Sequence, residues 1–361
     1  MVFLLSMNRN VIIYADSSAS APFRYRCLNI AEATKRSKKY NVTYFVGEEH
    51  EKAKKELKGA DILIIERQSD KNGNAKVLIR EARRLGVRVV YSVDDLVFAL
   101  RFLPLLMKST HSRNFLYWFG YVLGNNLLAR RADVFITTNQ FLADMLYRVF
   151  RKPSYVIPNF LNQKQIEASR MLPVKSEIFT IGYFSGSPTH YNDFLSIEIP
   201  LTKFLASHPD SHLFVVGCME FSDTMKSFFD SGQIEILEKV NYVKLQSYYS
   251  SVSVNLAPLV INDFTNCKSE LKFFEAAIAE TTTLASPTYT FAHAIRDGET
   301  GFLCKTTDDW YNRLEYLYSH PEENKKIAKA AKKYCIEHYY GPEILKTIED
   351  VYDKILESSQ K

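Results

Sequence analysis

Short apolar runs alternate with longer mixed segments along the chain, and this alternation constrains the fold more than any other feature. The runs are rich in β-branched residues and have the length of buried strands, whereas the segments between them are helix-like in composition. Such a succession predicts parallel strands joined by crossover helices. The first set of runs comprises 10–16, 41–47, 60–67, 87–95, 132–138 and 154–159, and the second comprises 178–186, 212–217, 233–237, 252–259, 281–286 and 301–305.

A polar connector, FLNQKQIEASRMLPVKSE (160–177), separates the two sets of runs. We therefore predict an α/β protein built from two Rossmann-like, doubly wound domains, 1–165 and 166–340, that face a central cleft. A Gly-Pro pair opens a last helix over about 341–361, and we expect this helix to pack back on the first domain.

Composition and charge exclude several classes of protein. The chain has 361 residues, 46% of them hydrophobic and 24% charged, with no repeat or disordered bias. A net charge of +5 without a Lys/Arg block gives little support to nucleic acid binding. The cysteines are never in a CxxC pair, so we expect neither a disulfide framework nor a metal site. We also expect the protein to be located in a reducing cytoplasm. They are Cys27, Cys218, Cys267, Cys304 and Cys335.

The stretch CKSELKFFEAA, 267–277, follows a predicted strand and combines a charged stripe with an apolar one. If it is helical, Lys268, Lys272 and Glu275 lie on one side at spacing i, i+4, i+7. A solvated face with ordinary ion pairs is one interpretation. The other is a phosphate site, because Lys268, Ser269 and Glu270 would occupy a helix start whose free N–H groups attract anions. Glu275 would then lie about 10 Å further along the axis, where it can accept ribose hydroxyl protons.

The stretch YFSGSPTHYND, 183–193, also follows a strand of the second set. Gly186 and Ser187 suit a tight turn where a ligand approaches the backbone, and His190 can donate to a phosphate or to a transferred group. An ordinary turn with a helix cap is the alternative.

Two pairs of polar residues in the first half are candidates for acceptor binding. Asp94 and Asp95 close a predicted strand, and we prefer contacts with acceptor hydroxyls to a metal site, because neighbouring strand residues point to opposite faces. Arg24 and Arg26 follow the first strand and can reach an anionic acceptor, with a surface pair as the alternative.

The segment 98–131 is rich in aromatic residues and ends in basic ones. An amphipathic basic helix of this kind can lie at a membrane interface, which would suit a lipid-linked acceptor, although burial in the core is the ordinary interpretation. No run approaches the length of a transmembrane helix, and MVFLLSMNRN lacks the basic start of a signal peptide.

Taken in order, VIPN, IGYFSG, FVVG, KSELKFFEAA and DGETGFL resemble the donor domain of glycosyltransferase family 4. APFRYR and VDDLVF resemble segments in the first domain of its bacterial polysaccharide members, so the likeness covers most of the chain. It implies the GT-B fold and retention of anomeric configuration. It also implies that Glu275 is the second glutamate of the family's E-x(7)-E motif, with the turn around Lys268 facing the diphosphate and donor sugar.

Two positions depart from that family's pattern. The first glutamate of the motif falls at Cys267, and the usual arginine after the first donor-domain strand falls at Ser187. Neither replacement can supply the lost charge. A diverged pattern N-x-K-S-x-L-K-x-x-E, opened by Asn266, would let Lys268, Lys272 and His190 neutralise the diphosphate instead.

The resemblance therefore implies a retaining hexosyltransferase that uses a nucleotide diphosphate sugar, with no cofactor and no metal. We expect catalytic roles for Lys268, His190 and Glu270, and donor contacts from Glu275, Gly186, Ser187, Lys272, Ser269 and Asn266. The acceptor would be a glycan or lipid-linked glycan of bacterial surface polysaccharide synthesis, and the protein would be cytoplasmic or peripheral at the inner membrane face. Two alternatives stay open: a nucleotide-sugar epimerase of similar architecture, and a non-catalytic subunit that binds nucleotide or glycan.

Overall fold

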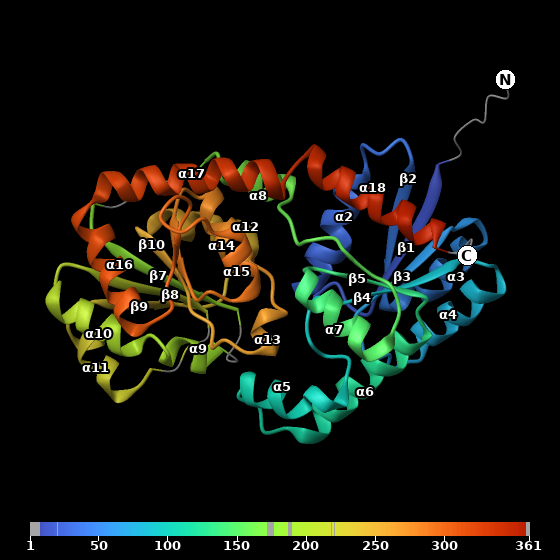
Figure 1. Cartoon of the computed structure of the whole chain (residues 1–361), viewed down its shortest axis with the longest axis horizontal. Coiled ribbons are helices and arrows are strands. Elements are labelled where there is room, and N and C mark those ends of the chain that lie inside the picture. The colour runs from blue at the N-terminus through green and yellow to red at the C-terminus, as the bar shows by residue number, and fades with distance from the viewer. Residues whose placement is uncertain are drawn as a thin grey trace.

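The computed structural model describes residues 8–19, 21–171, 177–186, 190–217, 219 and 221–358. These residues form two parallel sheets of six strands each, which lie side by side with helices around them (Figure 1). Every one of the twelve apolar runs contains one strand, so the predicted doubly wound α/β architecture is confirmed.

The first sheet has the strand order β2-β1-β3-β4-β5-β6. All of its neighbouring strands pair in parallel, which buries most strand residues on both faces and explains their nearly continuous apolar sequences. Its strands are β1 (Arg9–Ala15), β2 (Tyr40–Val46), β3 (Ile62–Glu66), β4 (Arg88–Ser92), β5 (Val134–Thr137) and β6 (Ser154–Val156).

The second sheet repeats this plan with the order β12-β11-β10-β7-β8-β9. Gly217 ends β8 beside Ser185 with a φ of 115°, and a Cβ atom there would lie 1.8 Å from the Ser185 carbonyl oxygen. Only glycine fits this position. The strands are β7 (Thr180–Ser185), β8 (His212–Gly217), β9 (Ile234–Leu237), β10 (Val254–Ala257), β11 (Thr282–Ala285) and β12 (Phe302–Leu303).

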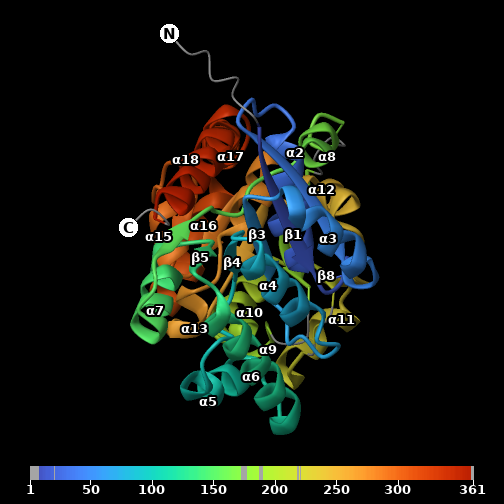
Figure 2. The ribbon, with the colours of Figure 1, turned by 90° about the vertical axis from the view of Figure 1, so that its right-hand side faces the viewer.

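Helices connect the strands of each sheet and cover its faces (Figures 1 and 2). A π-helical turn, Arg24–Leu28, joins α1 to α2. The helices of the first half are α1 (Ala21–Phe23), α2 (Asn29–Thr34), α3 (His50–Glu56), α4 (Asn74–Arg84), α5 (Leu103–Ser109), α6 (Phe115–Arg131) and α7 (Gln140–Phe150). Those that follow are α8 (Gln163–Ala168), α9 (Tyr191–Leu195), α10 (Glu198–Ser207), α11 (Asp223–Asp230), α12 (Tyr242–Ser251), α13 (Asp263–Asn266), α14 (Leu271–Ile278), α15 (Tyr289–Ala294) and α16 (Thr307–Ser319).

The last two helices link the halves. Helix α17 (Pro321–Tyr339) packs on α14 in the second half, and α18 (Pro342–Glu357) crosses to the first half, where it packs on α2 (Figure 1). Asp353 of α18 accepts hydrogen bonds from Lys39 at 3.0 Å and Tyr40 at 2.5 Å. One cluster of buried apolar side chains spans both halves at this seam and includes Ile13, Phe274 and Tyr352. Along the described residues, no helix is both long and apolar enough to cross a bilayer.

Candidate functional site

Helix α14 begins later than the sequence predicted. Its N-cap is Glu270 and its first residue is Leu271, so Lys268 and Ser269 lie in the turn between α13 and α14 rather than inside a helix. The reason is a short helix, α13, whose N-cap Asn262 forms a capping box with Thr265 and which ends at Asn266. The expected stripe of three charges is thereby broken, and its members make separate contacts.

Lys268 contacts the first half of the chain. Its Nζ lies 3.7 Å from Asp95 Oδ2 and 4.3 Å from the centre of the Phe264 ring. The structure thus brings together a predicted donor residue and a predicted acceptor residue, which are 173 positions apart, as an ion pair across the two halves.

Lys272, in the first turn of α14, carries an ammonium group that forms no ion pair with any of the described residues. Its Nζ is shielded from solvent and, within the part of the chain that the structure describes, has no hydrogen-bond partner. The nearest aromatic face is that of Tyr183, 4.7 Å from Nζ. Burial lowers the pKa of Lys272 to about 8; Asp193 opposes this shift and Lys268 adds to it. An anion placed here would relieve the cost of burying the charge.

His190 lies immediately before α9, close to this lysine. Its Nδ1 lies 2.9 Å from Asp193 Oδ2, and Asp193 Oδ1 accepts a hydrogen bond from the Val260 backbone N–H at 2.9 Å. Burial lowers the pKa of His190, although the hydrogen bond to Asp193 works in the opposite direction. The imidazole is therefore neutral near pH 7, so it can donate a hydrogen bond but adds little charge.

Gly186 follows β7 at the same edge of the second sheet. A Cβ atom at this position would meet no atom of the described residues within 4 Å, and the backbone φ is not in the left-handed region. The fold itself does not require glycine here, which leaves the space beside the backbone open to a ligand. Ser187, the other predicted donor contact in this turn, lies outside the described residues.

Glu275 is the centre of a buried polar network between the halves. Its Oε1 accepts hydrogen bonds from the Tyr25 hydroxyl, from Arg24 at 3.1 Å and from Gln165 at 3.2 Å, and the residue is 5% exposed. The Arg24 guanidinium also stacks on the rings of Tyr25, at 4.2 Å, and Tyr242, at 4.3 Å. The predicted ribose carboxylate and a predicted acceptor arginine are therefore paired with each other. A carboxylate has about four lone-pair positions. The hydroxyl groups of a ribose could therefore donate to the lone pairs of Glu275 that are still free, or replace Arg24 as its partner.

Asp94 and Asp95 lie beyond the end of β4, which closes at Ser92. Because the strand has ended, the expectation that the two carboxylates point to opposite faces does not hold: both contact Arg67, whose Nε lies 2.9 Å from Asp94 and whose Nη1 lies 3.6 Å from Asp95. The arginine takes the place that a cation would fill between them. Among the described residues, no group of three or more His, Cys, Asp or Glu side chains could hold a metal ion.

A further carboxylate, Glu66, ends β3 close to Asp94. It is 2% exposed, and neither of its oxygens has a hydrogen-bond partner among the described residues. Burial, with the negative charge of Asp94, raises the pKa of Glu66 well above its ordinary value, so this group holds a proton at neutral pH.

Arg26 is a buried anchor rather than a surface group. It is 0% exposed, and its Nη1 donates to the Ile157 carbonyl oxygen at 2.7 Å and to Asn159 Oδ1 at 3.3 Å. Asn159 in turn donates to Ser269 Oγ at 3.0 Å. Arg26 thus joins the turn after β1 to the segment that follows β6, and its side chain is not exposed for binding an acceptor.

Three other residues of the predicted motif face away from Lys272. Glu270 accepts a hydrogen bond from the Tyr339 hydroxyl at 2.8 Å, and Asn266 accepts one from the Tyr289 backbone N–H at 2.9 Å. Cys267 is 0% exposed and packs in the apolar core of the first half. Position 267 is therefore a core position here, where a carboxylate would be buried among apolar side chains.

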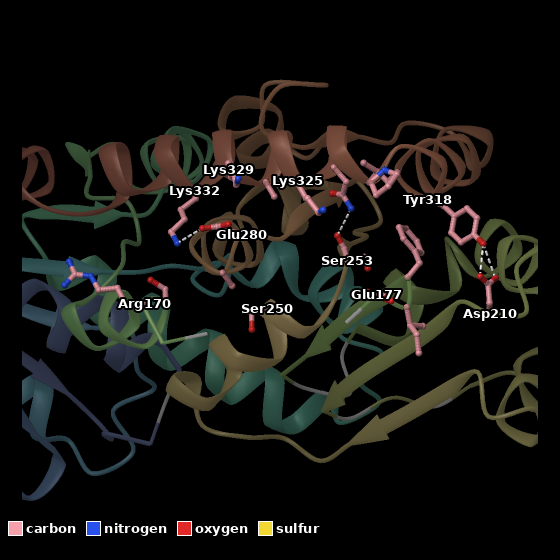
Figure 3. A pocket seen from close by; sticks show the side chains of 18 residues that line it. Arg170, Glu177, Asp210, Ser250, Ser253, Glu280, Tyr318, Lys325, Lys329 and Lys332 are labelled. Carbon is pink, nitrogen blue, oxygen red and sulfur yellow. Dashed lines mark hydrogen bonds and ion pairs between the residues drawn. The ribbon is translucent and has the colours of Figure 1, made fainter. Parts of the chain in front are cut away.

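A groove of about 1200 Å³ opens elsewhere on the second half (Figure 3). It is lined by residues that precede strands, such as Phe179 and Ser253, and by Lys325, Lys329 and Lys332 of α17. Since ligands of parallel α/β sheets bind at the carboxyl ends of strands, and this groove lies at their amino ends, we do not assign the site to it.

The residues that pair with the predicted site residues were not predicted from the sequence. Glu66 and Arg67 follow a strand, as Asp94 and Asp95 do, and could have been found by the same argument. Asp193 stands three residues after His190, which is a recognisable local pairing distance. By contrast, nothing local marks Tyr25 or Gln165, because their partner Glu275 is 250 and 110 positions away.

Comparison with known proteins agrees with this architecture. Residues 201–350 match a family model described as glycosyl transferase-like. No curated protein sequence matches the chain significantly. The crystal structure of HepE from Anabaena in complex with UDP-glucose is similar, with a TM-score of 0.64 and 14% identity over 95% of this chain and 99% of that one.

Two other structures are similar over nearly their whole length. Sucrose-phosphate synthase from Thermosynechococcus elongatus has a TM-score of 0.66 and 13% identity, covering 97% of this chain and 100% of its own. A glycosyltransferase from Rickettsia africae has a TM-score of 0.65 and 12% identity, covering 97% and 99%. The resemblance to family 4 glycosyltransferases and the GT-B fold that the sequence predicted are both confirmed.

Proposed function

We propose that this protein is a retaining glycosyltransferase that moves a hexosyl group from a nucleotide diphosphate sugar to a hydroxyl of a glycan or lipid-linked glycan. The glycosyl transferase-like match over 201–350 and the shared fold support the reaction class. We further propose that it acts in the cytoplasm or at the inner membrane face, in the synthesis of a bacterial surface polysaccharide.

The observation that carries the proposal is the unpaired ammonium group of Lys272. A shielded cation without an anion is costly, and such a group is retained where a ligand supplies the missing charge. Lys268 and the neutral His190 lie nearby, at the carboxyl edge of the second sheet where this fold class binds ligands. A diphosphate carries the charge that these groups lack.

In the proposed reaction, the bond between the anomeric carbon and the β-phosphate oxygen breaks as negative charge develops on the leaving diphosphate. Lys272 would stabilise that charge, and so would Lys268 once the diphosphate has replaced Asp95 as its partner. The acceptor oxygen bonds to the anomeric carbon on the same face, and its proton passes to the departing phosphate oxygen. The two ammonium groups supply the positive charge in this scheme, so we propose that turnover needs no divalent metal.

Two ion pairs lie where the donor would bind. Lys268 is paired with Asp95, and Glu275 with Arg24, and each pair joins the donor half to the acceptor half. A diphosphate would compete with Asp95 for Lys268, and ribose hydroxyls would compete with Arg24 for Glu275. Donor binding is thereby coupled to the contact between the halves, and the released Asp95 and Arg24 become available to an acceptor.

The test is calorimetric titration with UDP, GDP, dTDP and ADP, with UDP first because the similar HepE structure holds UDP-glucose. We expect saturable binding of one nucleotide that Lys272→Gln weakens by about tenfold or more, the value of a charge-assisted phosphate contact. Lys329→Gln, on an exposed face of α17, is the matched control and should bind as the wild type does. Equal affinity in all three proteins would place the nucleotide elsewhere.

A second candidate is a subunit that binds nucleotide without turnover, favoured by the buried thiol at position 267 where the resembled family has a carboxylate. Release of UDP from UDP-glucose by the purified chain, and its dependence on Lys268, decides between the two. We expect Lys268→Ala to lower the rate about a hundredfold. An epimerase would convert the sugar nucleotide without releasing UDP.

A further inference from the structure

The first turn of helix α6 is apolar and exposed. Phe115, Leu116, Tyr117 and Phe119, here called the aromatic tip, are 53%, 81%, 49% and 38% exposed. The rings of Phe115 and Phe119 stack with centroids 5.8 Å apart, so the tip is an ordered surface rather than a frayed end. Asn114 caps the helix by accepting from the Tyr117 backbone N–H at 3.0 Å.

The later turns of α6 are held firmly by the first half. Val122 and Leu128 are 1% and 0% exposed, and a Cβ atom on Gly124 would lie 2.4 Å from the Ser69 carbonyl oxygen, so the helix touches the loop after β3 directly. The helix is thus apolar in its exposed first turn as well as in its buried later turns, and it is not the amphipathic helix that the sequence predicted for this segment. A helix that is apolar all round is normally buried on all sides. Its exposed side needs a cover that the described chain does not provide.

The charges in the sequence on both sides of the tip are of one sign. Between Asp95 and Asp133 the sequence has no Asp or Glu, but it has Arg101, Lys108, Arg113, Arg130 and Arg131. Of these, all but Arg131 are exposed. Exposed Trp, Tyr and Phe beside Lys and Arg are the composition of segments that lie in the headgroup region of anionic bilayers.

The tip lies beside the donor half at the candidate site. His111, in the turn before α6, packs on Tyr191 with ring centroids 5.8 Å apart and lies 3.4 Å from Asn192. These residues follow His190 directly. Figures 1 and 2 both show α5 and α6 at the lower edge of the molecule, below α9. A bilayer that covers the tip would therefore lie next to the edge at which donor and acceptor meet.

We propose that the aromatic tip and its flanking basic residues dock the protein on an anionic lipid bilayer. This inference rests on the proposed function. Docking would hold the candidate site at the membrane surface, where the hydroxyl of a lipid-linked acceptor is exposed. The apolar tip residues enter the headgroup region, Lys108 and Arg113 contact lipid phosphates, and no part of the helix spans the bilayer.

Vesicle flotation and tryptophan fluorescence test the proposal without any sugar donor. Vesicles of phosphatidylcholine mixed with phosphatidylglycerol should carry the wild-type protein upward, and vesicles of phosphatidylcholine alone should carry much less. The chain has two tryptophans, Trp118 beside the tip and Trp310, which is 5% exposed. A shift of emission to shorter wavelength on adding anionic vesicles therefore reports on the tip.

The variant Leu116→Ser/Phe119→Ser should weaken vesicle binding by at least about tenfold, since each side chain loses its burial in lipid. Arg113→Gln should weaken it about fivefold and reduce its salt dependence. Ile199→Ser is the matched control, because Ile199 is 75% exposed on α10 of the other half, and it should bind as the wild type does. Nucleotide affinity measured on each variant shows that it is folded.

Two outcomes would overturn the proposal. The first is equal vesicle binding by the wild type and the double serine variant, or no binding by either. The second is a wild-type dimer in sedimentation that the double variant abolishes, which would show that a second copy covers the tip. Because vesicle binding and nucleotide binding are measured separately, failure of the docking surface leaves the proposed reaction standing, and the reverse also holds.

Discussion

Raising the pH should weaken nucleotide binding, because Lys272 loses its proton. Burial lowers the pKa of Lys272 to about 8 in the free protein, so this ammonium group loses its proton in a range where an ordinary lysine keeps it. A bound diphosphate stabilises the charged form and raises the pKa again. The protonated protein therefore binds more tightly, and affinity falls as pH rises through the pKa of the free protein.

The size of the effect follows from the fraction of protonated lysine. If only the ammonium form binds well, affinity falls about thirtyfold between about pH 7 and about pH 9.5. Binding also takes up protons: roughly 0.1 per nucleotide at pH 7, roughly 0.5 at pH 8 and roughly 0.9 at pH 9. His190 does not contribute, because burial lowers its pKa and leaves the imidazole neutral across this range.

Calorimetry in buffers of different ionisation enthalpy measures both quantities. The terminal phosphate of the nucleotide interferes little above about pH 8, because its last ionisation, near pH 6, is then complete. Lys272→Gln should bind weakly at every pH, with no proton uptake. An affinity that stays flat from pH 7 to 9.5, or a pH dependence that survives in Lys272→Gln, would refute the reasoning and remove Lys272 from the donor site.

Three further predictions concern buried groups. Cys267→Glu should lower the thermal midpoint without raising the rate of UDP release, because it places a carboxylate in an apolar core at a cost of several kcal/mol; a stable, faster variant would contradict this. Tyr25→Phe should lower the free energy of unfolding in urea by about 1–3 kcal/mol, because Glu275 loses a donor while buried; an unchanged value would show that the contact is replaced. Glu66 has a raised folded-state pKa, so its contribution to stability is present at low pH and is lost as pH rises through that pKa; Glu66→Gln should therefore narrow the gap in unfolding free energy between pH 5 and 8.5, and an equal gap would contradict the shift.

Much of the fold was predictable because its signals are local. A buried parallel strand is a short run of β-branched residues wherever it occurs, and a helix start at a Gly-Pro pair depends on only a few neighbouring residues. The same reasoning placed Lys268, Lys272 and His190 at one edge of the second sheet, since residues that follow parallel strands must share an edge. It failed for the start of α14, because a capping box at Asn262 starts a separate short helix, α13, and α14 begins only at Leu271.

The partners of the site residues were decided by tertiary structure alone. Arg24 and Arg26 are two positions apart, yet the π-helical turn that contains them turns one toward Glu275 and buries the other against Ile157. Lys268 and Asp95 were each recognised as polar groups after strands, but that they neutralise each other depends on how the halves dock. The sequence by itself determined which elements form and which residues end them, because those are short-range properties of the backbone. Which charges meet across 170 to 250 positions is set by the packing of one domain on the other, and no local pattern encodes it.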